Sequence, residues 1–160
     1  MVVVIMGVTG SGKTTIGRLL SEELGWTFYD ADDFHPRANI EKMQSGTPLN
    51  DDDRRPWLVT LSNLIRNCLE RGEQAVLACS ALKESYRKFL LVDDRVKLIY
   101  LKGDYCILQK RLSERRGHYM NPALLDSQLE TLEEPASGLQ VDISLSPGEI
   151  VKRIKTYLGM

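Results

Sequence analysis

A glycine-rich segment near the start of the chain constrains its fold more than any other feature. The pattern G-x-x-x-x-G-K-[ST] occurs at Gly7, Val8, Thr9, Gly10, Ser11, Gly12, Lys13 and Thr14. It follows the mostly β-branched run Val2–Met6 and precedes apolar residues at helical spacing between Thr14 and Leu24. A strand, a tight loop and a helix in this order direct backbone N–H groups and the positive helix end at one point. The segment therefore predicts a phosphate-binding site in an α/β fold.

The same loop predicts roles for two side chains. Lys13 would bridge the β- and γ-phosphates of a nucleotide, and the Thr14 hydroxyl would bind Mg²⁺. ATP and GTP are held alike by such loops, so other residues must separate kinases from switches and motors. The chain contains neither Asn-Lys-x-Asp nor Asp-x-x-Gly, which argues against a GTP-binding switch. The apolar run from Ala75 ends in Cys79 and Ser80 rather than in an acid, which argues against a motor ATPase. A small-molecule kinase is the class that remains.

Composition indicates one domain that spans residues 1–160. There are 21 basic and 22 acidic residues, a net charge of −1, so no long-range attraction to nucleic acid or to an anionic membrane is expected. Three separated cysteines predict neither a disulfide framework nor a zinc site. No apolar run is long enough for a signal peptide or a membrane span. We therefore expect a cytoplasmic protein with reduced thiols.

Apolar runs and amphipathic stretches alternate along the chain, which predicts a five-stranded parallel sheet with helices on both faces. The expected strands are Val2–Met6 at the centre, Trp26–Tyr29, Ala75–Cys79, Val96–Leu101 and Gln140–Ser144. The expected helices are Thr14–Leu24, Pro36–Ser45, Asp52–Arg71, Lys83–Leu91, Asp104–Arg115, Pro122–Leu132 and a terminal helix with a capping box at Ser146 and Glu149. The irregular segment near residues 111–121, with Gly117 as a hinge, is predicted to be a mobile lid.

Acidic residues follow the second expected strand. Because ligands bind at the carboxyl ends of strands in open α/β sheets, Asp30 and Asp32 are candidates for chemistry. We predict that Asp32 orients and deprotonates an acceptor hydroxyl and that Asp30 lies near Mg²⁺. A solvated turn that caps the next helix is the alternative interpretation, and it suits Asp33 better.

Basic residues occur in two further places. Arg111, Arg115 and Arg116 lie at the lid, where they could neutralise charge on a transferring phosphoryl group or simply complement a helix end. Lys83, Tyr86 and Arg87 are spaced i, i+3 and i+4, which predicts one helical face that binds an anion. For the run Asp51–Asp53, an acidic helix start is as good an interpretation as a functional role. Neither His35 nor His118 is assigned a chemical step.

Seen together, these motifs resemble the small gluconokinases with a phosphate-binding loop. The resemblance rests on Gly7–Thr14, Asp30–Pro36, Asn39–Met43, Pro48–Arg54, Pro56–Leu58, Cys79–Lys83, Tyr86-Arg87 and Gly117-His118. It implies a fold like that of shikimate and nucleoside monophosphate kinases. It further implies ATP-dependent phosphorylation of the terminal hydroxyl of D-gluconate, giving 6-phospho-D-gluconate and ADP. It also implies a homodimer and a gluconate site formed by Asp32, Arg54, Lys83 and Arg87.

Two other functions remain open from the sequence. One is a related kinase with another anionic acceptor, such as shikimate, a nucleoside monophosphate or adenylylsulfate. The other is a nucleotide-sensing module that binds ATP and transfers nothing, although the acid pair Asp30 and Asp32 argues against it. Turnover that depends on the acceptor distinguishes these possibilities.

Overall fold

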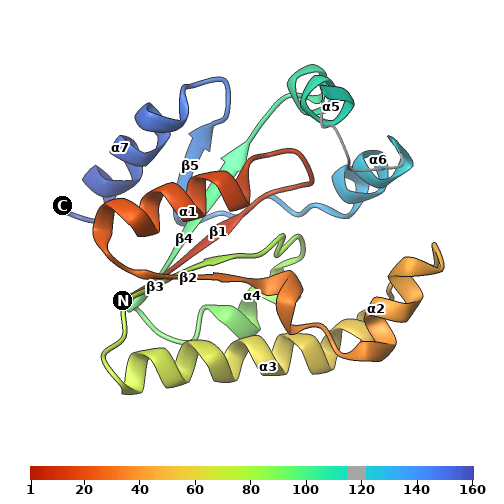
Figure 1. Cartoon of the computed structure of the whole chain (residues 1–160), viewed down its shortest axis with the longest axis horizontal. Helices are drawn as coiled ribbons and strands as arrows, with labels where there is room; N and C mark the ends of the chain where they lie inside the picture. Colours follow the sequence, from red (N-terminus) through yellow and green to blue (C-terminus); the bar gives the residue numbers. More distant parts are fainter. Residues whose placement is uncertain (115–121) are drawn as a thin grey trace.

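The central strand of the sheet is β1 (Val2–Met6), which pairs with a parallel strand on each side. The structure is a computed structural model and describes residues 1–114 and 122–160. In these ranges, five parallel strands run in the order β2-β3-β1-β4-β5 (Figure 1). The other strands are β2 (Thr27–Asp30), β3 (Ala75–Ala78), β4 (Val96–Lys102) and β5 (Leu139–Asp142). The predicted sheet and its central strand are confirmed.

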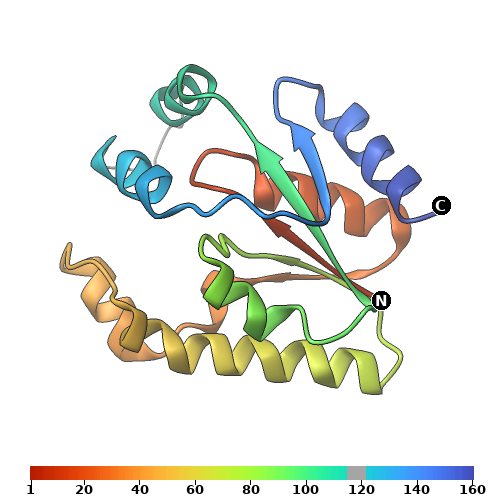
Figure 2. The same cartoon turned by 180° about the vertical axis from the view of Figure 1, so that it is seen from behind.

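Helices cover both faces of this sheet, as predicted (Figure 2). One face packs against α3 (Asp51–Glu70) and α4 (Glu84–Leu90). The other face packs against α1 (Lys13–Leu24), α5 (Tyr105–Glu114), α6 (Pro122–Thr131) and α7 (Pro147–Tyr157). Val2, Val4 and Met6 point into the first layer and Val3 and Ile5 into the second, so β1 is buried on both faces. Burial of such a side chain contributes roughly 1.5–3 kcal/mol to folding.

Local sequence signals set most element ends. Gly25 adopts a left-handed conformation (φ 69°) and ends α1, as its position predicts. Two features were missed by the sequence reading: the 3₁₀ helix η1 (Ala31–Phe34) and the reciprocal capping box at the start of α3. In that box Asn50 Oδ1 accepts from the Asp53 N–H, and Asp53 Oδ2 accepts from the Asn50 N–H. At α7, Ser146 Oγ accepts from the Glu149 N–H, which is one half of the predicted box.

Connections at the carboxyl ends of the strands bring the candidate residues to one edge of the sheet. The glycine-rich loop follows β1, η1 follows β2, and residues 79–83 follow β3 (Figure 1). The small helix α2 (Arg37–Gln44) projects beyond this edge, next to the start of α3. This edge is therefore where a ligand can meet all three connections.

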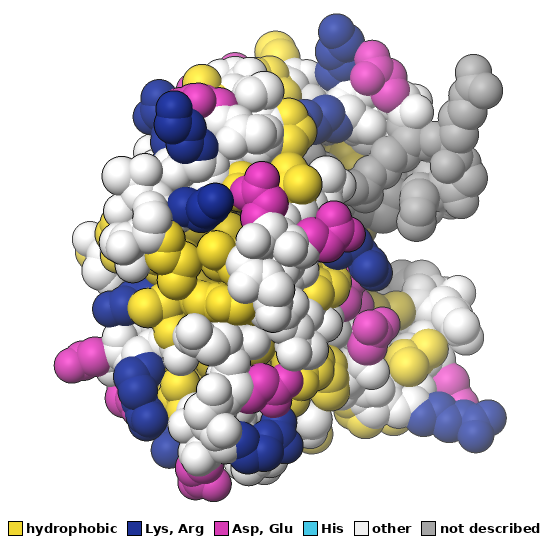
Figure 3. Space-filling model, turned by 60° about the vertical axis from the view of Figure 1, so that its left-hand side comes forward, with side chains coloured by type: hydrophobic (Ala, Val, Ile, Leu, Met, Phe, Trp, Pro, Cys, Tyr) yellow, Lys and Arg dark blue, Asp and Glu magenta, His cyan; other side chains and the backbone are white. Residues whose placement is uncertain are grey.

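One face of the molecule shows side chains of both charges. On the face shown in Figure 3, acidic and basic side chains are interspersed over the described residues. Within residues 1–114 and 122–160, no helix has the length and apolar character that crossing a membrane requires.

Candidate active site

The backbone of the glycine-rich loop follows a path that depends on two of its glycines. Gly10 and Gly12 have φ of 82° and 93°, a region that residues with a side chain rarely adopt. A Cβ on Gly10 would also lie 3.1 Å from Leu112 Cγ. The Ser11 N–H donates to the Val8 carbonyl (3.1 Å), which closes the turn. Both glycines are therefore required by the backbone path of the loop.

Lys13 is the first residue of α1, and its ammonium group turns back over the loop. Lys13 Nζ donates to the Val8 carbonyl oxygen at 3.1 Å. In the same loop, the Ser11 Oγ is buried and has no hydrogen-bond partner among the described residues. A Cβ on Gly7 would lie 2.5 Å from that hydroxyl, so Gly7 leaves the space that Ser11 fills. The loop is thus a compact ring of backbone groups that binds the Lys13 ammonium group.

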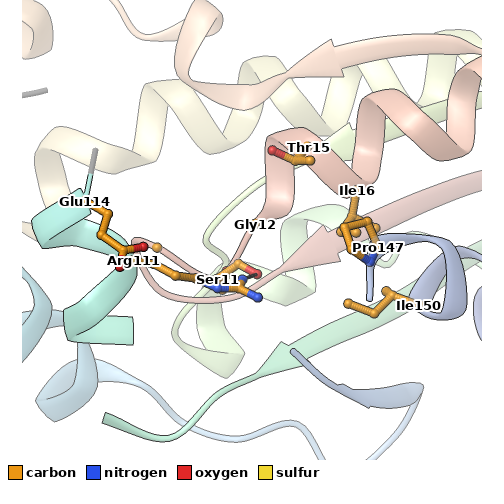
Figure 4. A pocket seen from close by; sticks show the side chains of 9 residues that line it. Ser11, Gly12, Thr15, Ile16, Arg111, Glu114, Pro147 and Ile150 are labelled. Atoms are coloured by element: carbon orange, nitrogen blue, oxygen red, sulfur yellow. Dashed lines mark hydrogen bonds between the residues drawn. The ribbon is translucent and has the colours of Figure 1, made fainter. Parts of the chain in front are cut away.

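A cleft of about 330 Å³ opens beside this loop (Figure 4). It is lined by Gly10, Ser11, Gly12, Thr15, Ile16, Arg111, Glu114, Pro147 and Ile150. Arg111, from α5, forms one wall: its guanidinium donates to the Ile143 carbonyl (2.7 Å) and to the Ser11 carbonyl (3.4 Å). Pro147 and Ile150 of α7 lie near Ile16, and these three give another wall that is apolar. The cleft can accept a flat apolar group whose charged tail reaches the loop.

The acid pair lies at the carboxyl end of β2, where Asp30 is the last strand residue and Asp32 belongs to η1. Asp30 Oδ1 accepts from the Asp32 N–H at 3.0 Å, which caps η1. The surrounding protein partly desolvates the Asp32 carboxyl and raises its pKa, although the residue keeps contact with solvent. The charge of Asp30 raises this pKa further, while Lys13 lowers it. A carboxylate with a raised pKa that feels the charge of the loop lysine is suited to accept a proton.

A second group of polar side chains joins the start of α3 to the start of α4, and we call Asp51, Arg54, Lys83 and Tyr86 the α3–α4 cluster. Lys83 Nζ lies 3.2 Å from both carboxylate oxygens of Asp51. The Tyr86 hydroxyl donates to Asp51 Oδ1 (2.5 Å) and accepts from Arg54 Nη1 (3.3 Å). Hydrogen bonds from Tyr86 and Lys83 lower the pKa of Asp51. The cluster is therefore a cationic site that already contains one carboxylate.

Arg87 does not belong to the α3–α4 cluster, so the predicted shared face of Lys83, Tyr86 and Arg87 is wrong for this residue. Arg87 is 5% exposed, and its guanidinium donates to the carbonyls of Ala81 (2.8 Å), Leu82 (3.2 Å) and Glu133 (2.8 Å). Ala81 has a φ of 46°, a conformation that costs energy outside glycine. Arg87 thus holds a strained connection after β3. Helical spacing alone could not show this, because the carbonyl acceptors lie outside the helix.

Aromatic stacking and hydrogen bonds fix η1 and α2 against α3. The His35 and Trp57 rings stack with centroids 4.3 Å apart, and Trp57 Nε1 donates to the Ala31 carbonyl at 2.7 Å. Asn39 is buried, and its Nδ2 donates to the Asp53 carbonyl at 2.8 Å. These contacts give His35 a positioning role beside Asp32 and Asp33. The stacking on Trp57 therefore explains the presence of His35 without assigning it a step in the chemistry.

The sequence reading missed two residues of this edge. The sequence is equally consistent with Asp51 as part of an acidic helix start, whereas the structure makes it the acceptor at the centre of the α3–α4 cluster. Gln128 of α6 was not singled out, yet its Oε1 accepts from the N–H of Thr9 in the glycine-rich loop at 2.6 Å. No local pattern indicates either contact, since the partners are 32 and 119 residues apart.

The donors available for a metal are few. Over residues 1–114 and 122–160, no three His, Cys, Asp or Glu side chains form a metal-binding group. Mg²⁺ in nucleotide sites takes one or two protein oxygens and completes its shell with phosphates and water. The Thr14 hydroxyl on the first turn of α1 and the carboxylate of Asp30 are oxygen donors of this kind. The site therefore fits a magnesium–nucleotide complex and lacks a dedicated metal cage in the described part of the chain.

Several predicted lid residues lie outside the described residues, namely Arg115, Arg116, Gly117 and His118. Of the predicted lid, residues 111–114 are described, and they form the last turn of α5.

Taken together, the fold and this edge define a kinase with a phosphate-binding loop, a phosphotransferase that acts on small molecules. A profile of the shikimate kinase family matches residues 9–140. The chain is 45% identical to a probable gluconokinase from Xenopus tropicalis, over 97% of this chain and 92% of that one.

Solved structures agree. A sugar kinase from Janibacter sp. superposes with a TM-score of 0.90 at 42% identity, covering 99% of this chain and 94% of the other. A gluconokinase from Sinorhizobium meliloti gives a TM-score of 0.84 at 39% identity, covering 98% and 94%. The chain belongs to the gluconokinase family.

Proposed function

We propose that this protein transfers the γ-phosphoryl group of ATP to the terminal hydroxyl of D-gluconate. The observation that carries the proposal is the position of Asp32, which interacts electrostatically with Lys13 of the glycine-rich loop at the edge that the α3–α4 cluster shares. The family's gluconokinase members support gluconate as the acceptor. One edge thus provides a phosphate site, a proton acceptor and a cationic site.

The nucleotide would occupy the loop and the cleft beside it. Backbone N–H groups of Gly7–Thr14 and the amino end of α1 would bind the β- and γ-phosphates, with Lys13 between them. The adenine and ribose would lie in the 330 Å³ cleft, between Arg111 and the apolar wall at Pro147. Thr14 and Asp30 would hold Mg²⁺, which supplies charge neutralisation of the phosphates when bound.

The acceptor would lie between Asp32 and the α3–α4 cluster. Gluconate has one carboxylate and five hydroxyls, so it requires cations for the first and mixed donors and acceptors for the rest. Lys83 and Arg54 would bind its carboxylate end, and Asp32 would accept a hydrogen bond from the terminal hydroxyl. Arg87 would contribute indirectly, by holding the connection after β3 in place, because its guanidinium already donates to three carbonyls.

The transfer step balances with these groups. The terminal hydroxyl oxygen forms a bond to the γ-phosphorus, the bond from that phosphorus to the β–γ bridging oxygen breaks, and Asp32 takes the hydroxyl proton. Lys13 stabilises the charge that develops on the phosphoryl and leaving oxygens. We also propose that Arg111, Arg115 and Arg116 neutralise this developing negative charge. The products are ADP and 6-phospho-D-gluconate.

The proposal extends to assembly and location. The family resemblance supports a homodimer, and the net charge of −1 supports a protein without a nucleic-acid or membrane partner. Three separated cysteines, read as reduced thiols, support a cytoplasmic location. Sedimentation equilibrium of the purified chain tests the dimer.

An ADP-release assay tests the proposed function. ATP and Mg²⁺ are supplied with D-gluconate, shikimate, a nucleoside monophosphate or adenylylsulfate in separate reactions. We expect turnover with D-gluconate that exceeds the other acceptors by at least about tenfold in kcat/KM, a difference of 1.4 kcal/mol. Preference for another acceptor would replace gluconate, and no acceptor-dependent ADP release would instead indicate a nucleotide sensor.

A further inference from the structure

The end of α6 connects the glycine-rich loop to the α3–α4 cluster. At the loop, Gln128 Oε1 accepts a hydrogen bond from the Thr9 N–H at 2.6 Å. Thr9 is only 8% exposed, so its amide needs a partner inside the protein. A neutral amide oxygen satisfies this donor without placing a negative charge next to the phosphates. Glutamine therefore suits position 128 better than glutamate, because it accepts the hydrogen bond without adding a negative charge.

Five residues later, the same segment binds both sides of Lys83. The Glu133 N–H donates to the Leu82 carbonyl at 2.8 Å. The Glu133 carboxylate accepts from the Glu84 N–H at 2.9 Å, and the Glu133 carbonyl accepts from Arg87 Nη2 at 2.8 Å. The backbone that flanks Lys83 is thus fixed to residue 133 by two hydrogen bonds, and the Arg87 side chain adds a third.

The segment between these two attachments is a packed unit. The Leu132 N–H donates to the Gln128 carbonyl at 2.9 Å, which continues the helical bonding to residue 132. Leu125 is 2% exposed, and Leu129 packs with it in the core on the α1 side of the sheet. Leu132 packs against the cores on both faces of the sheet. Movement at Gln128 therefore displaces Glu133, because the intervening residues are held as one body.

We propose that Gln128 is a positioning residue that couples occupancy of the glycine-rich loop to the affinity of the α3–α4 cluster for its acceptor. This inference rests on the proposed function, because it takes D-gluconate as the ligand of Lys83. Binding of phosphates fixes Thr9, Gln128 keeps the end of α6 against the loop, and Glu133 then holds Lys83 in its binding position. By reciprocity, gluconate tightens nucleotide binding by the same factor.

Calorimetric titration of the purified protein tests the coupling. The probe is a non-hydrolysable ATP analogue with Mg²⁺, titrated with and without saturating D-gluconate. In the unchanged protein, we expect gluconate to lower the Kd of the analogue at least about fivefold. In Gln128→Met, which keeps side-chain length and removes the acceptor, we expect a factor below about two, with each ligand's separate Kd changed less than about threefold.

Two variants serve as controls for this titration. Gln128→Glu retains an acceptor for the Thr9 N–H, so it should restore the coupling factor while its charge weakens binding of the analogue. Gln109→Met makes the same substitution at an exposed position of α5 and should keep the factor of the unchanged protein. A Gln128→Met protein with the full coupling factor overturns the inference.

The unchanged protein separates failure of the inference from failure of the proposed function. Binding of both ligands without any coupling overturns the inference and leaves the gluconokinase proposal standing, whereas absence of gluconate binding overturns both. Hydrogen exchange of the unchanged protein gives a second test, which does not depend on whether the variants fold. The analogue alone should slow exchange of the Glu84 amide, and an unchanged Glu84 rate overturns the inference as well.

Discussion

Lys83 and Asp51 form a salt bridge in which the ammonium nitrogen lies 3.2 Å from each carboxylate oxygen, although the two residues are 32 positions apart. Asp51 also accepts from the Tyr86 hydroxyl, so one carboxylate orders the cation and the phenol together. The proposed gluconate carboxylate would meet Lys83 in an orientation that Asp51 has already set. Preorganisation of this kind reduces the entropy cost of binding.

Replacement of Lys83 tests its assignment to the acceptor. Lys83→Met keeps the aliphatic length and removes the cation, so KM for gluconate should rise roughly 10- to 100-fold, as expected for loss of a charged hydrogen bond. KM for ATP should change less than about twofold, because Lys83 is not part of the glycine-rich loop. Initial rates over a grid of both substrates measure this, with the exposed Lys88→Met of α4 as the control. Equal losses for both substrates would refute the assignment.

Lys13→Ala should abolish turnover. The change removes the cation above the loop, so we expect kcat to fall on the order of 10³-fold or more. ADP release at saturating ATP and gluconate measures the loss. Lys88→Ala removes an exposed lysine of α4 and should retain normal activity. A near-normal kcat for Lys13→Ala would contradict the position given to the phosphates.

Asp32→Asn should separate catalysis from stability. The carboxylate takes the proton, so kcat should fall about 10²- to 10⁴-fold while the Kd of ATP changes little. Because its pKa is raised, ionised Asp32 lowers the stability of the folded protein above the ordinary aspartate range, and the variant should unfold at an equal or higher urea concentration at pH 7. Kinetic and urea titrations measure the two effects.

The same raised pKa sets the acid side of the pH profile. In the unchanged protein, kcat should decline with falling pH from a point above 3.8, the ordinary pKa of aspartate. Equal losses of kcat and ATP affinity in Asp32→Asn would reassign the residue to holding the metal or the nucleotide.

Arg87→Met should destabilise the protein. The substitution removes the donor of the Ala81 and Glu133 carbonyls and one of the two donors of the Leu82 carbonyl, which keeps the Glu133 N–H. We expect a loss of about 2–4 kcal/mol in the free energy of unfolding. Urea unfolding measures it, with exposed Lys88→Met as the matched control. A stability equal to the unchanged protein, combined with a large rise in KM for gluconate, would return Arg87 to the acceptor site.

Glu73 gives a prediction away from the active site. Hydrogen bonds from Tyr29 (2.8 Å) and Arg71 (2.5 Å) lower the pKa of Glu73 to about 2. Glu73→Gln should cost about 1–2 kcal/mol of stability at pH 7, without a change in kcat. Because the folded pKa is depressed, this contribution is present above pH 4.5, the ordinary glutamate value, and disappears as pH falls toward 2.

Unfolding experiments at several pH values check this dependence. The difference between Glu73→Gln and the unchanged protein should shrink between pH 4.5 and 2. Glu70→Gln, at an exposed position of α3, is the control and should show no comparable change. A difference that stays constant across this range would show that the negative charge of Glu73 does not stabilise the folded protein.

Sequence by itself determined the elements and the phosphate loop. Strand runs, helical periodicity and turn residues act over a few positions, so the five strands, Gly25 at the end of α1 and the glycine-rich loop could all be located locally. The Asn50–Asp53 capping box has an equally local signal, an acceptor and an acid three residues apart, although it is not among the features predicted above.

Tertiary structure alone decided which side chains share a partner. Arg87 is buried against three carbonyls, Asp51 meets Lys83, and Gln128 reaches Thr9, because the sheet order and helix packing bring residues 32 to 119 positions apart into contact. Helical spacing states which residues share a face of one helix, but it carries no information about the groups that this face meets. Hydrogen bonds depend on distances of about 3 Å, and only the packed fold sets such distances between remote segments.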